Sequence, residues 1–251
     1  MNTAGTRSLD SAAARNHLLE ALPPGDYARV APCLELVHCP AGMILLDEGH
    51  HADRVYFPAT CIAARLCAFH DGVTVEQSIV GCDGFVGVPA FLGGGAVPWR
   101  VETIIAGDAL KMPAAALLAE FHRGGTLQRL LLEYAQRLIV QVSSEALCRT
   151  HHTVERRLAR LLLQVIERWA EADLPLTQES LGLLLGARRE TVCHASARLQ
   201  AQGCIRQRRG RVTVLDPERL RTTACECSRA VSSLPARASS PHPSEPSDGL
   251  Q

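Results

Sequence analysis

The sequence predicts an α+β protein in which an antiparallel, jelly-roll-like β-roll precedes a long helix and a small C-terminal unit of short helices and a β-hairpin. Three observations predict this fold. Short apolar runs alternate with turn residues over 36–111, an apolar repeat of three and four residues covers 127–142, and short amphipathic segments precede an arginine-rich segment within 176–217. The 251 residues are enough for one large or two modest domains, at roughly 100 to 200 residues each.

The N-terminal half is expected to consist mainly of short antiparallel strands. We expect residues 1–16 to be flexible and 17–123 to form the roll, which opens with one or two short helices broken at Pro23-Pro24. The predicted strands are the runs MILL, RVYF, RLCAF, VTVEQSIV and VETII. Strands spaced by roughly 8 to 12 residues, with Asp71-Gly72 as a hairpin turn, favour an antiparallel sandwich or roll.

A long helix is predicted after Gly124-Gly125, over residues 124–150. Its apolar stripe consists of Leu127, Leu131, Tyr134, Leu138 and Val142. Such a stripe indicates one buried face. The helix could pack on its own sheet or pair with its copy in a dimer. We assign it as a dimerisation helix and the five residues as the dimer interface.

The C-terminal part, residues 151–222, has the pattern of a winged helix-turn-helix. A helix over HTVERRLARLLLQVIERWAEA precedes a short helix that begins near Thr177, buries Leu181, Leu184 and Leu185, and ends at Gly186. The next helix buries Val192, Ala195 and Leu199, which directs Glu190 and His194 outward and places Arg189 on the flank of its first turn. The second helix of such a pair fits the major groove of DNA, so we predict that Arg189, Glu190 and His194 read bases.

The segment GCIRQRRGRVTVLDP alternates as two strands about Arg209-Gly210 and predicts a hairpin with a basic tip. The whole chain has 26 basic and 26 acidic side chains, yet seven arginines and one glutamate lie between Arg188 and Arg211. Such local segregation of charge is typical of a surface that binds nucleic acid. The residues predicted to contact phosphates are Thr177, Gln178, Arg188, Arg206, Arg208, Arg209 and Arg211.

The stretch LTQESLGLLLGARRETV closely resembles the helix-turn-helix motif of the Crp/Fnr superfamily of bacterial transcription regulators, and the order of elements matches over residues 17–222. The resemblance implies a cyclic-nucleotide-binding-like roll as the effector domain and a homodimer on a palindromic operator. Double-stranded DNA and RNA polymerase are the other expected partners. Arg189 and Glu190 fall on the family's base-reading positions, while His194 stands where cyclic-AMP-responsive members carry a second arginine.

The roll departs from the cyclic-nucleotide-binding members of the family. Those members carry a phosphate cassette of the form GE-x-G-[LI] followed by RSA or RTA. Here the segment reads GCDGFVGVPAFLGGGAVPWRVET, with Phe85 near the glutamate position, Pro98-Trp99 near the arginine and serine, and Arg100 shifted by a residue or two. We therefore predict that the effector is not a cyclic nucleotide. It stays unknown and could be a small molecule, a metal or a change of redox state.

Ten cysteines are scattered along the chain, and no cofactor is predicted from them. Cys33, Cys39, Cys61 and Cys67 lack the clustered spacing of iron-sulfur oxygen sensors. The pair Cys225 and Cys227 is more suggestive, because a C-x-C near a DNA-binding unit could hold zinc or copper with a third group, or act as a redox couple. A metal- or redox-responsive regulator is therefore the alternative function. His151-His152 are expected to be surface histidines.

A cupin-like metalloenzyme is a remote alternative, because cupins share the jelly-roll pattern. Their metal site needs an H-x-H pair, whereas His50-His51 are adjacent and would alternate across a strand. No catalytic motif appears, so we predict that the protein is not an enzyme. Residues 223–251 are rich in serine and proline and are expected to be largely disordered. The chain has no signal-peptide pattern and no apolar run of about 18 residues, which predicts a cytoplasmic protein without a membrane contact.

Overall fold

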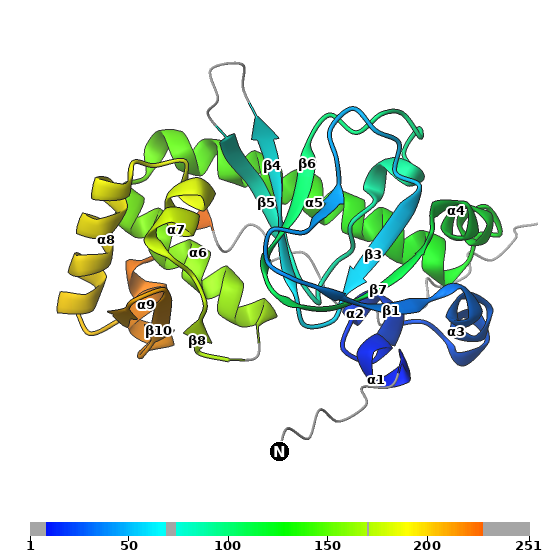
Figure 1. Cartoon of the computed structure of the whole chain (residues 1–251), viewed down its shortest axis with the longest axis horizontal. Helices are drawn as coiled ribbons and strands as arrows, with labels where there is room; N and C mark the ends of the chain where they lie inside the picture. The colour runs from blue at the N-terminus through cyan, green and yellow to red at the C-terminus, as the bar shows by residue number, and fades with distance from the viewer. Residues whose placement is uncertain (1–8, 69–73, 170, 228–251) are drawn as a thin grey trace, which may run out of the picture.

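The computed structural model describes residues 9–68, 74–169 and 171–227 and has the α+β fold that the sequence predicts (Figure 1). Its first elements are the short helices α1 (Leu9–Ala13), α2 (His17–Glu20) and α3 (Pro24–Val30), followed by the 3-10 turn η1 (Ala31–Cys33). Pro24 occupies the first position of α3, where its missing N–H costs no helical hydrogen bond. The predicted break at Pro23-Pro24 is thus the start of a helix.

Two antiparallel sheets form the roll. The first sheet has the order β1-β7-β3 and consists of β1 (Glu35–Cys39), β7 (Gly107–Pro113) and β3 (Arg54–Pro58). The second sheet has the order β2-β6-β4-β5 and consists of β2 (Ile44–Leu46), β6 (Arg100–Ile105), β4 (Ile62–Ala68) and β5 (Thr74–Val80). The 3-10 turn η2 (Val88–Ala90) lies between β5 and β6. Each of the five predicted strands overlaps one of β2 to β6, whereas β1 and β7, which pair with each other, were not identified individually. The predicted turn at Asp71-Gly72 lies outside the described residues.

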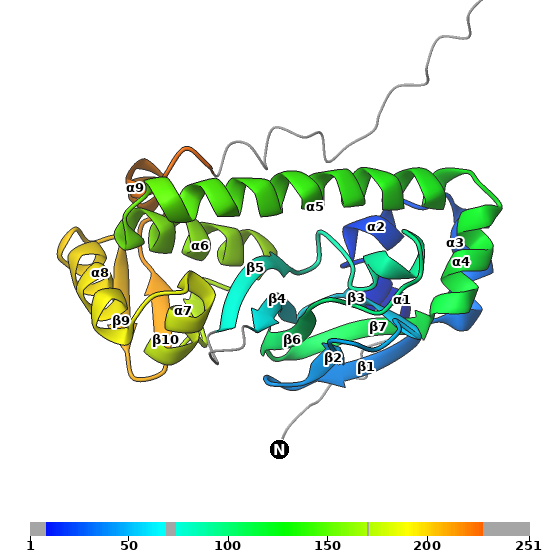
Figure 2. The same cartoon turned by 90° about the horizontal axis from the view of Figure 1, so that it is seen from above.

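Helix α4 (Ala114–His122) leads into the long helix α5 (Thr126–His151), which runs along one side of the molecule (Figure 2). The predicted dimer-interface residues are packed against this chain's own roll: Leu127, Leu131, Tyr134 and Leu138 are at most 7% exposed, and Val142 packs against the same cluster. Their assignment to a dimer interface was wrong, because the roll of the same chain already covers them. The opposite face of α5 is free of the roll.

The C-terminal unit begins with α6 (Val154–Arg168) and contains α7 (Gln178–Leu185) and α8 (Arg189–Ala201). The strands β9 (Ile205–Arg208) and β10 (Arg211–Val214) form the predicted hairpin, and β8 (Asp173–Leu174), which was not predicted, adds a third strand beside β10. Helix α9 (Pro217–Thr223) follows. The expectation of disorder from residue 223 needs correction at its start, because Ala224 and Cys225 are buried; residues 228–251 lie outside the described residues.

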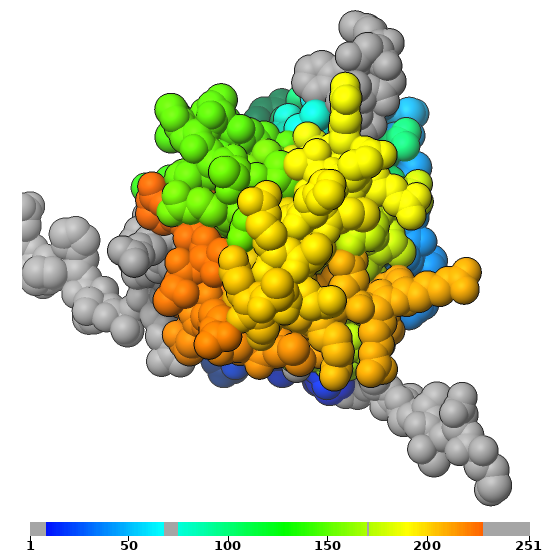
Figure 3. Space-filling view, turned by 90° about the vertical axis from the view of Figure 1, so that its left-hand side faces the viewer, coloured from blue at the N-terminus to red at the C-terminus, as the bar shows by residue number. Residues whose placement is uncertain are grey.

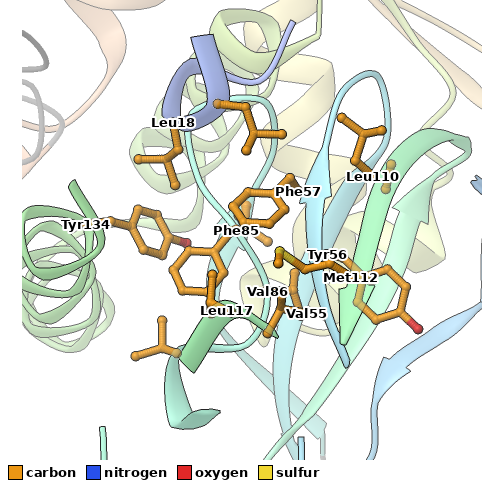
Figure 4. Packing of buried hydrophobic residues seen from close by; sticks show 14 of the residues in the cluster. Leu18, Val55, Tyr56, Phe57, Phe85, Val86, Leu110, Met112, Leu117 and Tyr134 are labelled. Carbon is orange, nitrogen blue, oxygen red and sulfur yellow. The ribbon is translucent and has the colours of Figure 1, made fainter. Parts of the chain in front are cut away.

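Two hydrophobic clusters hold these parts together. In the first, inside the roll, the ring centroid of Phe85 lies 5.6 Å from that of Phe57 and 5.2 Å from that of Tyr134 of α5 (Figure 4). In the second, Ile62 and Ile79 of the four-stranded sheet pack with the buried leucines of α6 and α7. The C-terminal unit is therefore docked on the roll through a continuous apolar contact.

The N-terminal segment is more ordered than the sequence suggests. Residues 1–16 were expected to be flexible, but Ala12 and Ala13 are buried and Asn16 is fully buried. The Asn16 side chain accepts hydrogen bonds from the backbone of Leu18 and Leu19 and donates to the carbonyl oxygens of Pro58 and Gly84, both at 2.9 Å. One side chain thus caps α2 and ties it to the end of β3 and to the loop that follows β5.

We predict that Asn16→Ala lowers the free energy of unfolding by about 2 to 4 kcal/mol, because it removes a helix cap and leaves buried backbone acceptors without donors. Urea denaturation measures the change. The neighbouring substitution Arg15→Ala, at an exposed position, is the control and should change the value by about 0.5 kcal/mol or less. Equal effects of the two substitutions would show that Asn16 does not anchor the segment.

Candidate nucleic-acid interface

Helix α7 begins and ends at the residues that the sequence indicates. Thr177 caps its N-terminus, accepting a hydrogen bond from the Ser180 amide at 3.0 Å, while the Ser180 hydroxyl accepts one from the Thr177 amide at 2.8 Å. Gly186 ends the helix with φ 55°, a left-handed conformation that favours glycine. A Cβ there would also lie 2.5 Å from Nη1 of Arg149, which would have to shift, so the turn between α7 and α8 favours glycine for two reasons.

Helix α8 presents the predicted base-reading side chains to solvent. Val192, Ala195 and Leu199 are buried against the rest of the unit, as the spacing predicts. The opposite face, at the N-terminal half of the helix, carries the exposed residues Arg189, Glu190 and His194. Arg188 is the N-cap residue, and its side chain makes no capping hydrogen bond to the described backbone. A guanidinium, a carboxylate and an imidazole therefore lie exposed within two turns.

The hairpin places further arginines beside α8. Its two-residue turn is Arg209-Gly210, and Gly210 has φ 74°. The side chains of Arg206, Arg208 and Arg209 are exposed. Arg211 is exposed as well, and its Nε donates to Asp173 of β8 at 2.6 Å. This hydrogen bond holds the pKa of the Asp173 carboxyl below its usual value.

Thr177 and Gln178, two further residues predicted to contact phosphates, are engaged inside the unit. The Thr177 hydroxyl serves in the cap described above, and Nε2 of Gln178 lies 3.4 Å from the Ser196 hydroxyl on α8. Thr177 therefore caps α7, and Gln178 joins the start of α7 to α8. Figure 3 shows the end of the molecule formed by α7, α8 and the hairpin. The helices (yellow) and the hairpin (orange) lie side by side on this surface.

Buried charges at the end of α5 fix this unit on the roll. Nη2 of Arg149 forms an ion pair with Glu76 of β5 at 3.1 Å, and Nη1 donates to the carbonyl oxygen of Leu185 at the end of α7 at 3.2 Å. Arg160 of α6 pairs with Glu145 of α5. Burial, and then the charge of Glu145, raise the pKa of Glu76, while the charge of Arg149 acts in the opposite direction. These contacts set the position of α7, and with it that of α8, relative to the sheet.

The interior of the roll is filled by aromatic side chains. Phe85 is 1% exposed within the aromatic cluster, and Trp99 lies beneath the guanidinium of Arg65, whose carbon is 4.4 Å from the ring centroid. The cavity between them has a volume of about 10 Å³, enough for about one water molecule. Arg100 faces away to an exposed ion pair with Asp47 at 3.1 Å. None of the groups at the cassette positions therefore converges on a space that could hold a nucleotide.

The histidine pair weighed for a cupin-like site lies outside the strands. His50 and His51 are exposed in the loop between β2 and β3, and their Nδ1 atoms lie 3.0 Å and 3.1 Å from the backbone oxygens of Glu48 and Gly94. They make separate contacts and do not face a common point.

The cysteine pair near the C-terminus lies close to two further potential metal ligands that the sequence analysis did not identify. Cys225 and Cys227 lie beside Cys148 and His152, and these four form the one group of three or more possible metal ligands found within the described residues. His152 was expected at the surface, yet only 10% of its side chain is exposed. The spacing of these residues in the chain gave no signal for the group, because 72 residues lie between His152 and Cys225.

Among the described residues, no helix combines the length and the apolar character needed to cross a membrane.

Comparisons with known proteins agree with this architecture. A family model described as a Crp-like helix-turn-helix domain matches residues 156–223. A CRP-like cAMP-activated global transcriptional regulator of Mycobacterium tuberculosis is 26% identical over 219 residues, which cover 84% of this chain and 98% of that protein.

Two solved structures show the same fold. A transcriptional regulator of the Crp/Fnr family from Eubacterium rectale matches with a TM-score of 0.63 and 16% identity, over 82% of this chain and 96% of that one. A CRP/FNR-family transcriptional regulator from Thermus thermophilus matches with a TM-score of 0.61 and 21% identity, over 76% of this chain and 98% of that one.

The family match falls on the part of the chain that contains α7, α8 and the arginine hairpin. The proteins that match along most of the chain are regulators of transcription and not enzymes. Residues 156–223 match a Crp-like helix-turn-helix domain, and the chain as a whole is similar to DNA-binding transcription regulators of the Crp/Fnr type.

Proposed function

We propose that this regulator binds a palindromic DNA operator as a homodimer in the cytoplasm and that its effector is not a cyclic nucleotide. The observation that carries the proposal is the exposed set Arg189, Glu190 and His194 on α8, beside a hairpin with exposed arginines. RNA polymerase is the further partner that regulation of transcription requires.

The exposed groups of α8 match the chemistry of base edges in the major groove. A guanidinium such as that of Arg189 can donate two hydrogen bonds to O6 and N7 of guanine, and the Glu190 carboxylate can accept one from N4 of cytosine. His194 can donate to a purine acceptor. Arg206, Arg208 and Arg209 supply charge for the phosphates, which positions the protein without selecting a sequence.

The free face of α5 offers a surface for a second copy. Leu132, Ile139 and Leu147 of α5 are 45%, 66% and 61% exposed, whereas the leucines of its buried stripe pack on the roll. The helix runs along one side of the molecule (Figure 2). Leu132 and Ile139 are seven residues apart, the repeat of a helix that pairs along one seam. A two-fold dimer through this face would present two copies of α8, which suits a palindromic operator.

We predict that Arg189→Ala and Glu190→Ala each lower the preference for the cognate base pair by roughly 1 to 3 kcal/mol, because each removes a base-specific hydrogen bond. Arg208→Ala should instead weaken binding to all sequences alike and reduce the slope of log K against log salt by about one. Titrations of cognate and random duplexes at several salt concentrations measure both effects. Equal losses on the two duplexes for Arg189→Ala would show that α8 does not read bases.

We predict that Ile139→Glu converts a dimer into a monomer of 27.1 kDa, because it places a charge in the apolar seam. Sedimentation equilibrium gives the mass directly. Leu92→Glu, at a 53% exposed leucine of the roll, is the matched control and should leave the dimer intact. A wild-type chain that stays monomeric even with operator DNA would contradict the dimer.

We predict that cyclic AMP and cyclic GMP leave operator affinity unchanged, since Phe85 and Trp99 occupy the roll interior and Arg100 is paired with Asp47. The test is to titrate each nucleotide while following operator affinity. A tenfold tightening, which corresponds to about 1.4 kcal/mol of coupling, would mean that the roll opens and that another group binds the cyclic phosphate.

A further inference from the structure

Four potential metal ligands meet where the long helix α5 joins the DNA-binding unit. Cys148 lies in the last turn of α5 and His152 is its C-cap residue, so a spacing of four residues puts both on one face. Cys225 and Cys227 follow α9, the last helix of the unit in the chain. The ligand atoms of all four residues lie within 4.8 Å of one another.

The separations suit four ligands of a single ion. Sγ of Cys148 lies 3.4 Å from Sγ of Cys225, and Sγ of Cys227 lies 3.6 Å from Nδ1 of His152. Around a tetrahedral Zn²⁺ with bonds of about 2.3 Å to sulfur and about 2.0 Å to nitrogen, ligand atoms are roughly 3.5 to 3.8 Å apart. The two sulfurs are too far apart for a disulfide, whose bond is about 2.05 Å.

The group is shielded from water, as the ligands of a structural metal site are. Cys148 and Cys225 are 0% and 1% exposed, and Cys227 is half-buried at the edge. Arg160 beside them is 2% exposed, and its Nε and Nη1 atoms have no hydrogen-bond partner among the described residues. Its positive charge acts on both buried sulfurs. Three thiolates and one divalent ion carry a net charge of −1, which a buried cation partly offsets.

A second layer of contacts orients the imidazole. Nε2 of His152 faces Oε1 of Glu226 at 3.4 Å, and Arg156 holds the other oxygen of that carboxylate at 3.2 Å. When Nε2 donates to Glu226, the lone pair of Nδ1 points toward the sulfurs. Metal-binding histidines commonly have such a carboxylate behind them, which fixes the tautomer and strengthens the ligand.

We propose that Cys148, His152, Cys225 and Cys227 bind one Zn²⁺ per chain and thereby fasten the segment after α9 to the end of α5. Thiolate and imidazole ligands in a tetrahedron favour zinc among the common divalent metals. A four-iron cluster does not fit, because its cysteine ligands bind different iron atoms and lie farther apart than ligands of one ion.

The test uses the full-length chain, purified anaerobically with its thiols reduced. Its zinc content is measured by mass spectrometry, and the metal is then removed with a chelator and replaced with Co²⁺. We expect about one zinc per chain, and for Co²⁺ a thiolate charge-transfer band with the visible bands of tetrahedral coordination. Removal of the metal should lower the melting temperature, because zinc binds the folded site and not the unfolded chain.

Variants separate this site from other thiols. Cys227→Ser, at the half-buried edge, should weaken zinc binding at least tenfold, and Glu226→Gln should weaken it by about 10- to 100-fold. Cys33→Ser changes an exposed cysteine of the roll and should bind zinc as the wild type does. The proposal fails if the reduced wild type takes up no zinc, or if Cys227→Ser and Glu226→Gln bind it as tightly as Cys33→Ser. Metal content is measured without DNA, so this outcome leaves the proposed operator binding untouched.

Discussion

Helix α5 contacts both the roll and the DNA-binding unit and joins them in the chain. Its 26 residues span about 39 Å at 1.5 Å each. Along one face, Leu131 and Tyr134 pack in the core of the roll. At the C-terminal end, Glu145 pairs with Arg160 of α6 and Arg149 donates to the carbonyl oxygen of Leu185 at the end of α7. A rigid element with this many attachments leaves α8 little freedom to move independently of the roll.

The charges at that end are buried, which gives them an effect on geometry as well as on stability. A buried ion pair contributes little net free energy, but loss of one partner leaves an uncompensated charge and is strongly destabilising. Arg149 contacts β5 through Glu76 and α7 through the carbonyl oxygen of Leu185, so two structural units depend on one guanidinium. Arg149 thus links β5 to the end of α7 directly.

Local patterns in the sequence predicted local structure well. The leucines of α7, the glycine at 186 and the alternation of the hairpin each fix a conformation within a few residues, and the structure has all three. What covers a buried stripe is a tertiary property. The stripe of Leu127 to Val142 therefore predicted the buried face of α5 but not its partner, which is the chain's own roll. Cys148 and His152 escaped notice for the same reason, since only folding brings them to Cys225.

The most direct test of a dimer that reads DNA through α8 is selection of binding sites from random duplexes. The account predicts one enriched site with two-fold symmetry, whose half-site centres are about one helical turn, or 10 to 10.5 base pairs, apart, or a multiple of that spacing. The same selection with the Arg189→Ala variant should not enrich this sequence. An unenriched pool, or a single site without symmetry, would contradict the account.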